Sequence, residues 1–129
     1  MPPEVAPAGT PLCRLADIPE EGTKGFTLGE GEWPLRGLLV RAGGAVHAYV
    51  NRCPHAGHQL SFRPDRFLTP DGRLIQCQSH GALFDKASGE CVGGPCVGEA
   101  LTRIPVATDA EWVRLADEVD IDRLATRYW

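Results

Sequence analysis

The sequence lacks the features that would assign it to a membrane, a secretory pathway or a nucleic acid. No window of its 129 residues approaches the roughly 18 consecutive apolar residues that a membrane-spanning helix needs. The N-terminus has neither a basic start nor an apolar run, so we expect no secretory signal. The net charge is −4 and no basic stripe is present, which argues against phosphate binding. We therefore expect a cytoplasmic protein that binds neither a membrane nor nucleic acid.

The usual catalytic motifs are also missing. There is no glycine-rich motif for the phosphates of NAD or FAD. Outside the cysteine–histidine segments discussed below, no cluster of two histidines and a carboxylate is visible for the mononuclear iron of an oxygenase. The sequence shows no internal repeat and no low-complexity tract. We therefore expect that the chain is not an enzyme by itself, and that any catalysis takes place on a partner.

The composition favours a small all-β domain. Hydrophobic residues make up 43% and charged residues 23%, so a packed core is expected. Fifteen glycines and eleven prolines indicate many turns and few long helices. Residues 35–41 and 45–51 are predicted to pair as strands around Gly43-Gly44, and residues 74–76 to follow a turn at Pro70-Asp71-Gly72. His47 lies in the second of these strands and is expected to face solvent.

Three regions are predicted along the chain. Residues 1–11 are rich in proline, alanine and glycine and read as a flexible arm, and residues 12–117 form the domain. Residues 118–129 are predicted to be a short C-terminal helical tail that Asp120 caps. Apolar residues recur there at helical spacing: Ile121, Leu124, Ala125 and Tyr128.

Two short segments combine cysteine with histidine. Cys53-Pro54-His55 and Cys77-Gln78-Ser79-His80 each follow an apolar stretch, which places each of them on a loop at the end of a strand. Thiolate is a soft anionic ligand of iron–sulfur clusters, and imidazole is a neutral ligand that iron also accepts. We therefore predict one metal centre held between the two loops by Cys53, His55, Cys77 and His80.

The two segments resemble the ligand motifs of Rieske [2Fe–2S] proteins. Residues 82–85 are similar to the usual continuation of the second motif, and Gly93-Gly94-Pro95 is similar to the proline loop that covers the cluster in this family. The resemblance extends from about residue 12 to residue 115. It implies an all-β domain of stacked antiparallel sheets that holds one Rieske-type [2Fe–2S] cluster.

The resemblance also implies a role for each ligand. Cys53 and Cys77 would bind one iron, while His55 and His80 would bind the other through Nδ1. The iron bound by histidine would be the one reduced, with the imidazole edges near the surface as the exit for the electron. Two neutral histidines in place of two thiolates leave the oxidised centre formally neutral, which makes it easier to reduce than an all-cysteine cluster.

Within the Rieske family the sequence resembles the soluble, low-potential ferredoxins of ring-hydroxylating dioxygenase systems. Members from respiratory cytochrome bc complexes carry an extra cysteine in each motif, where this chain has His58 and Ser79. They also carry a hydroxyl donor after the second motif, where this chain has Ala82. Fewer donors to the cluster sulfurs predict a lower potential. The segment between the motifs is longer than usual, and residues 63–72 are expected to form an extra turn.

The resemblance implies electron transport as the function: one electron at a time from a flavin reductase to an oxygenase. A redox-sensing or regulatory module is an alternative, motivated by the unmatched C-terminal tail. The small subunit of a nitrite-reductase-type enzyme is another. These alternatives would use the same cluster.

The cysteines and histidines also permit other interpretations. The four ligands could bind Zn²⁺ instead, but zinc modules usually pair Cys-x-x-Cys with His-x₃-His, so the mixed motifs favour the cluster. His58 is expected to be an exposed loop histidine, with proton uptake or partner contact as the alternative. Cys13 is expected to pack as a small apolar residue. Cys91 and Cys96 are expected to pack likewise, with a disulfide or redox-sensing pair as the alternative.

Overall fold

The structure, a computed structural model, describes residues 5–29, 35–52, 60, 65–78, 81–94, 97–121 and 124. Its regular structure is almost entirely β-strand, and every strand pair is antiparallel. One 3₁₀ helix, η1, spans Leu15–Asp17. The strands are β1 (Val5–Ala6), β2 (Pro11–Arg14), β3 (Thr23–Leu28), β4 (Leu35–Ala42), β5 (Ala45–Val50), β6 (Leu74–Gln76), β7 (Leu83–Asp85), β8 (Cys91–Gly93), β9 (Arg103–Ile104), β10 (Val106–Thr108), β11 (Trp112–Leu115) and β12 (Val119–Asp120). The all-β prediction is confirmed.

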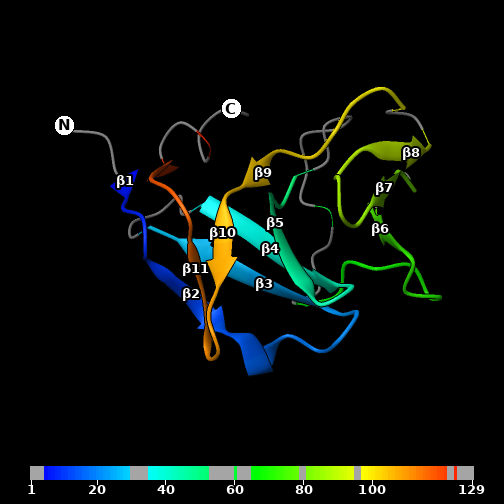
Figure 1. Ribbon diagram of the computed structural model, residues 1–129. Helices are drawn as coiled ribbons and strands as arrows, with labels where there is room; N and C mark the ends of the chain where they lie inside the picture. The colour runs from blue at the N-terminus through cyan, green and yellow to red at the C-terminus, as the bar shows by residue number, and fades with distance from the viewer. Residues whose placement is uncertain are drawn as a thin grey trace.

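The strands form three larger sheets and one small pair (Figure 1). The middle sheet has the order β3-β4-β5-β9, the outer sheet β10-β11-β2, and the ligand sheet β6-β7-β8. In Figure 1 the ligand sheet lies on one side of β5 and the outer sheet lies on the other. The described part of the chain contains no helix that is long and apolar enough to cross a membrane.

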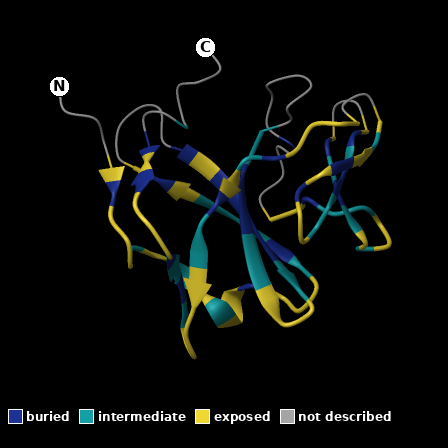
Figure 2. Cartoon of the chain, turned by 45° about the horizontal axis from the view of Figure 1, so that its top comes forward, coloured by how far each residue is buried: buried dark blue, intermediate teal, exposed yellow. Residues whose placement is uncertain are grey.

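The centre of β4 is buried on both faces, which explains its consecutive apolar residues Leu38, Leu39 and Val40. Leu38 and its cross-strand partner Tyr49 belong to the core that packs beneath the ligand sheet. Leu39 and its partner Ala48 belong to the core that packs against the outer sheet. Successive side chains of a strand point to opposite faces, so a strand between two cores is apolar at every position. Figure 2 shows buried positions concentrated in these strands.

The hairpins predicted from local turn residues are present. Gly43 and Gly44 join β4 to β5 with φ values of 59° and 80°, the left-handed conformations that a tight hairpin needs. The turn before β6 closes with the N–H of Gly72 donating to the carbonyl oxygen of Thr69 at 2.8 Å. His47 on β5 is not fully solvent-facing as expected, because it is half-buried and its Nδ1 lies 3.3 Å from Nη1 of Arg103.

The two ends of the described chain are joined. β1 pairs with β12, with Val5 opposite Asp120 and Ala6 opposite Val119. Both strands lie in segments that we expected to fall outside the domain. The boundaries of the domain at residues 12 and 117 remain a prediction. Ile121 and Leu124 are helical, which is the described part of the predicted C-terminal helix.

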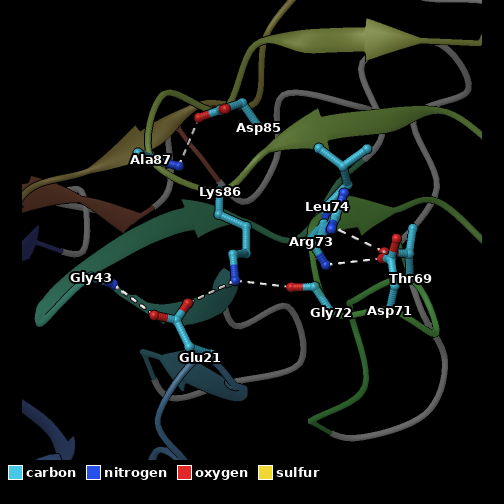
Figure 3. Close-up of polar contacts among 10 residues, drawn as sticks. All are labelled: Glu21, Gly43, Thr69, Asp71, Gly72, Arg73, Leu74, Asp85, Lys86 and Ala87. Atoms are coloured by element: carbon cyan, nitrogen blue, oxygen red, sulfur yellow. Dashed lines mark hydrogen bonds and ion pairs between the residues drawn. The ribbon is translucent and has the colours of Figure 1, made fainter.

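Besides the core that they share, the ligand sheet and the middle sheet are joined by Lys86, in the turn after β7 (Figure 3). Nζ of Lys86 forms an ion pair with Oε2 of Glu21 at 3.0 Å and donates to the carbonyl oxygen of Gly72 at 2.9 Å. Oε1 of Glu21 accepts the N–H of Gly43 at 2.9 Å. One ammonium group therefore links turns that belong to both sheets.

The long segment between the two motifs is anchored on β3. The side chain of Asp65 accepts the N–H of Gly25 at 2.8 Å, and its carbonyl oxygen accepts the hydroxyl of Thr23 at 2.7 Å. Phe67 is buried in the core beneath the ligand sheet. The extra turn, Thr69–Gly72, stands at the end of β6 opposite to Cys77, so this part of the long segment lies away from the predicted ligand.

Candidate metal centre

Cys77 lies at the end of β6, where the ligand sheet turns back on itself. The N–H of Cys77 donates to the carbonyl oxygen of Ala82 at 2.9 Å, and the N–H of Gly81 donates to the carbonyl oxygen of Cys77 at 3.0 Å. Gly81 has a φ of 72°, a conformation that costs other residues free energy, which accounts for glycine after the second motif. These contacts fix residues 77–82, the second ligand segment, as the connection between β6 and β7.

The first ligand segment, residues 52–59, begins at the end of β5. Oδ1 of Asn51 accepts the N–H of Leu60 at 2.8 Å, so the residues on either side of this segment are bonded to each other. The carbonyl oxygen of Leu60 accepts the N–H of Gln78 at 2.8 Å. Gln78 directly follows Cys77, so Leu60, which follows the first ligand segment in the sequence, is bonded to the second ligand segment beside Cys77.

The loop after β8 packs directly on the second ligand segment. A Cβ atom on Gly94 would lie 2.8 Å from Cα of Ala82 and 3.3 Å from the carbonyl oxygen of Gly81, which is too close for any side chain. The Sγ of Cys91 donates to the carbonyl oxygen of Gly93 at 3.1 Å. The position of Gly94 agrees with the resemblance of this loop to a cluster-covering loop.

Two exposed valines border the loop. Val92 on β8 is 55% exposed and Val97 is 67% exposed. Exposed apolar side chains can belong to a surface where a partner binds. Val92 is followed directly by Gly93 and Gly94, and Gly94 packs on Ala82 of the second ligand segment.

Only one predicted ligand falls in the described part of the chain. Cys77 is completely buried in the core beneath the ligand sheet. Cys53, His55 and His80 lie outside the described residues, as do His58, Ser79, Pro95 and Cys96. Within residues 5–29, 35–52, 60, 65–78, 81–94, 97–121 and 124, no three His, Cys, Asp or Glu side chains form a metal-binding group.

The surroundings of Cys77 fit an iron–sulfur cluster. Cys77 follows a buried strand and precedes a tight turn. Its thiol can therefore bind a metal centre that the protein core shields from water on one side. The hydrogen bonds of Leu60 tie Asn51, which precedes the first ligand segment in the sequence, to Gln78, which follows Cys77. The donor set of two thiolates and two imidazoles matches a Rieske centre.

Other candidate residues are accounted for in different ways. Cys13 on β2 is half-buried among apolar residues of the outer sheet, and burial raises the pKa of its thiol. This is consistent with packing rather than reactivity. Cys91 is buried in the same core as Cys77, as expected for a packing residue. Burial, followed by the charge of Arg103, lowers the pKa of His47.

Antiparallel sheets with Cys77 on the connection between β6 and β7, in a chain that also carries a Cys-x-His motif, are consistent with an iron–sulfur protein of mixed cysteine and histidine ligands. The Rieske [2Fe–2S] domain family matches residues 9–110. The chain belongs to this family.

Solved structures share the fold. The ferredoxin of Sphingomonas yanoikuyae B1 is 23% identical, and the match covers 84% of this chain and 98% of that chain with a TM-score of 0.63. The ferredoxin of carbazole 1,9a-dioxygenase from Nocardioides aromaticivorans IC177 is 20% identical, with coverage of 85% and 98% and a TM-score of 0.64. The terminal oxygenase of carbazole 1,9a-dioxygenase from Novosphingobium sp. KA1 is 25% identical, with coverage of 85% and 31% and a TM-score of 0.65.

Among characterised proteins, the oxidoreductase NdmD of Pseudomonas putida is 33% identical over 57 residues. The match covers 44% of this chain and 9% of NdmD, so this chain corresponds to a small part of that protein.

The structure adds two residues that the sequence motifs do not single out. Asn51 and Leu60 enclose the first ligand segment, and Leu60 also contacts the second. The sequence signal for Asn51 is an asparagine at the end of a strand, two residues before Cys53. Its short side chain readily accepts hydrogen bonds from backbone N–H groups. Leu60 carries no such signal, since its role depends on its main chain.

Proposed function

We propose that this chain is a one-electron carrier that passes electrons from a flavin reductase to an oxygenase. The observation that carries the proposal is the pair of hydrogen bonds that leads from Asn51 through Leu60 to Gln78, beside the buried Cys77. When bound at Cys53, His55, Cys77 and His80, a Rieske cluster takes up and releases one electron at a time.

The extent of the structural similarity supports a carrier rather than an oxygenase. The matches cover 98% of two ferredoxin chains but only 29% and 31% of two terminal oxygenase chains. One solved structure with the same fold is a complex of reduced oxygenase and oxidized ferredoxin in carbazole 1,9a-dioxygenase. An oxygenase partner for this chain is inferred from that example, and a flavin reductase is inferred as the electron source.

The exposed valines suggest where a partner would approach. Val92 and Val97 are exposed apolar residues on either side of the loop whose Gly94 packs on Ala82, and electron transfer requires that a partner come close to the cluster. We also infer a cytoplasmic location, because Cys13 and Cys77 are not in disulfides and a reducing compartment keeps thiols in that state.

The test is an electron count on the cluster-loaded protein. We expect dithionite to add one electron per chain, and we expect an NADH-dependent flavin reductase to reduce cytochrome c faster when the holoprotein is present. Cys77→Ser should abolish both results, whereas Cys91→Ser, which changes another buried cysteine of the same core, should preserve them. A cluster-loaded wild type that accepts no electron from either donor would refute the proposal.

A further inference from the structure

Asn51 connects the middle sheet to the first ligand segment. Its backbone N–H donates to the carbonyl oxygen of Arg36 at 2.9 Å, which continues the pairing of β4 with β5. Its side-chain oxygen accepts the N–H of Leu60 at 2.8 Å. The main chain of Asn51 is therefore fixed to the sheet, while its side chain holds the far end of the segment that carries Cys53 and His55.

Leu60 extends this connection to the second ligand segment. Its side chain is completely buried in the core that also contains Cys77. Its carbonyl oxygen accepts the N–H of Gln78 at 2.8 Å. Two consecutive hydrogen bonds thus lead from the side chain of Asn51, through the main chain of Leu60, to the residue next to Cys77.

The Asn51 bond differs from the side-chain bonds that merely close turns. The carboxylate of Asp109 accepts the N–H groups of Glu111 and Trp112, two and three residues away. The bond from Asn51 spans nine residues and encloses two predicted ligands. Fixing both ends of such a segment reduces the conformational freedom that would otherwise be lost when ligands are brought to a metal.

We propose that Asn51 is a positioning residue for the iron–sulfur centre, because its side-chain oxygen holds Leu60, whose carbonyl oxygen in turn holds Gln78, the residue next to Cys77. This inference rests on the ligands named in the proposed function. Groups that orient metal ligands typically contribute about 10- to 100-fold to metal affinity.

Substitutions at position 51 can distinguish the effect of the hydrogen bond to Leu60 from the effect of charge near the cluster. The N–H of Leu60 donates, so residue 51 must supply an acceptor oxygen on a short side chain. Alanine supplies no acceptor. Aspartate supplies an oxygen at the same place but adds a negative charge, which makes reduction of a nearby centre less favourable.

The experiment compares the holoproteins of wild type, Asn51→Ala, Asn51→Asp and the control Asp109→Ala. The loss of visible cluster absorption after addition of an iron chelator gives the release rate, and voltammetry gives the midpoint potential. We expect Asn51→Ala to lose iron about 10- to 100-fold faster than wild type. Asn51→Asp should keep the wild-type release rate with a lower midpoint potential, and Asp109→Ala should match wild type in both.

The outcomes distinguish this inference from the proposed function. A wild type that assembles no cluster overturns both. A wild type that holds its cluster, together with an Asn51→Ala variant that releases iron at the same rate, overturns the role of Asn51 alone. If Asn51→Ala yields no soluble holoprotein, the Asn51→Asp variant provides the test. Iron release at the wild-type rate with a lower midpoint potential supports the inference, and faster iron release overturns it.

Discussion

Gly94 shows how a single residue fixes the loop beside the metal centre. Its φ is 85°, and its α-carbon faces the backbone of Ala82, so a side chain would be both strained and in collision. Gly98 has a similar φ of 100° but no atom within 4 Å of the position of an added Cβ. The two glycines therefore separate the cost of backbone conformation from the cost of a clash.

We expect Gly94→Ala to destabilise the holoprotein by more than about 2 kcal/mol, because left-handed strain and overpacking add. Gly98→Ala should cost only the conformational part, about 1–2 kcal/mol. Thermal unfolding, followed by circular dichroism and by the visible absorption of the cluster, measures both. Equal losses in the two variants would show that the loop does not pack on Ala82.

His47 provides a second prediction for a single residue. Burial and then Arg103 lower its pKa below the ordinary value of 6.5, because both disfavour the imidazolium ion. The folded protein then binds this proton more weakly than the unfolded chain. The resulting stability is present above pH 6.5 and is lost as the pH falls through the pKa of the folded state.

Titration by NMR should give a pKa below 6.5 for His47 in the wild type. Arg103→Gln should raise this pKa without restoring 6.5, because burial remains. Arg114→Gln, on the outer sheet, should leave it unchanged. A wild-type pKa at or above 6.5 would contradict this account.

Between elements, the polar contacts of Lys86 add to the core that joins the ligand sheet to the middle sheet. The side chain of Lys86 is 13% exposed, whereas that of its partner Glu21 is 60% exposed. The bond from Lys86 to the carbonyl oxygen of Gly72 is therefore better protected from water than the ion pair. Of the free energy that these two contacts contribute, most should therefore come from the hydrogen bond between Lys86 and Gly72.

We expect Lys86→Met to reduce the free energy of unfolding by about 1–3 kcal/mol, since it leaves a half-buried carbonyl oxygen without its charged donor. Glu21→Gln should have a smaller effect, and added salt should diminish that effect further. Denaturation midpoints of the two variants and of wild type provide the test. A larger loss in Glu21→Gln would mean that the ion pair holds the turns together.

At the scale of the elements, the sequence predicts the structural features that depend on residues close to each other along the chain. The hairpin at Gly43-Gly44 and the position of Cys77 at a strand end follow from local turn chemistry and alternation. The burial of Tyr49 beneath the ligand sheet does not follow from local sequence, because it depends on a sheet built from residues farther along the chain. The half-burial of His47 beside Arg103 has the same origin.

Long-range pairing was equally invisible in the sequence. The pairing of β1 with β12 joins strands of two residues each from opposite ends of the chain, and neither has a periodic pattern of its own. For the metal centre, the ligand motifs are explicit in the sequence. The bond between Asn51 and Leu60 is not, because it joins residues nine positions apart in the sequence.

At the scale of the whole molecule, the account predicts a low midpoint potential. Ala82, completely buried in the second ligand segment, provides no hydroxyl donor beside the cluster site. We expect a midpoint nearer about −150 mV than +300 mV. Ala82→Ser should raise it by on the order of 50 mV, if one added hydrogen bond stabilises the reduced state by about 1 kcal/mol. Voltammetry on both proteins measures this, and a wild-type value near the upper end would contradict the argument from His58, Ser79 and Ala82.

The central claim is that Cys53, His55, Cys77 and His80 hold a Rieske [2Fe–2S] cluster. Pulsed electron paramagnetic resonance of the dithionite-reduced protein tests it most directly, because nitrogen bound to the reduced iron couples to the unpaired electron. We predict strong nitrogen couplings from two histidines, and loss of the intact Rieske signal in both His55→Ala and His80→Ala. A reduced protein that shows no such coupling, or the unchanged wild-type signal in both variants, would contradict the claim.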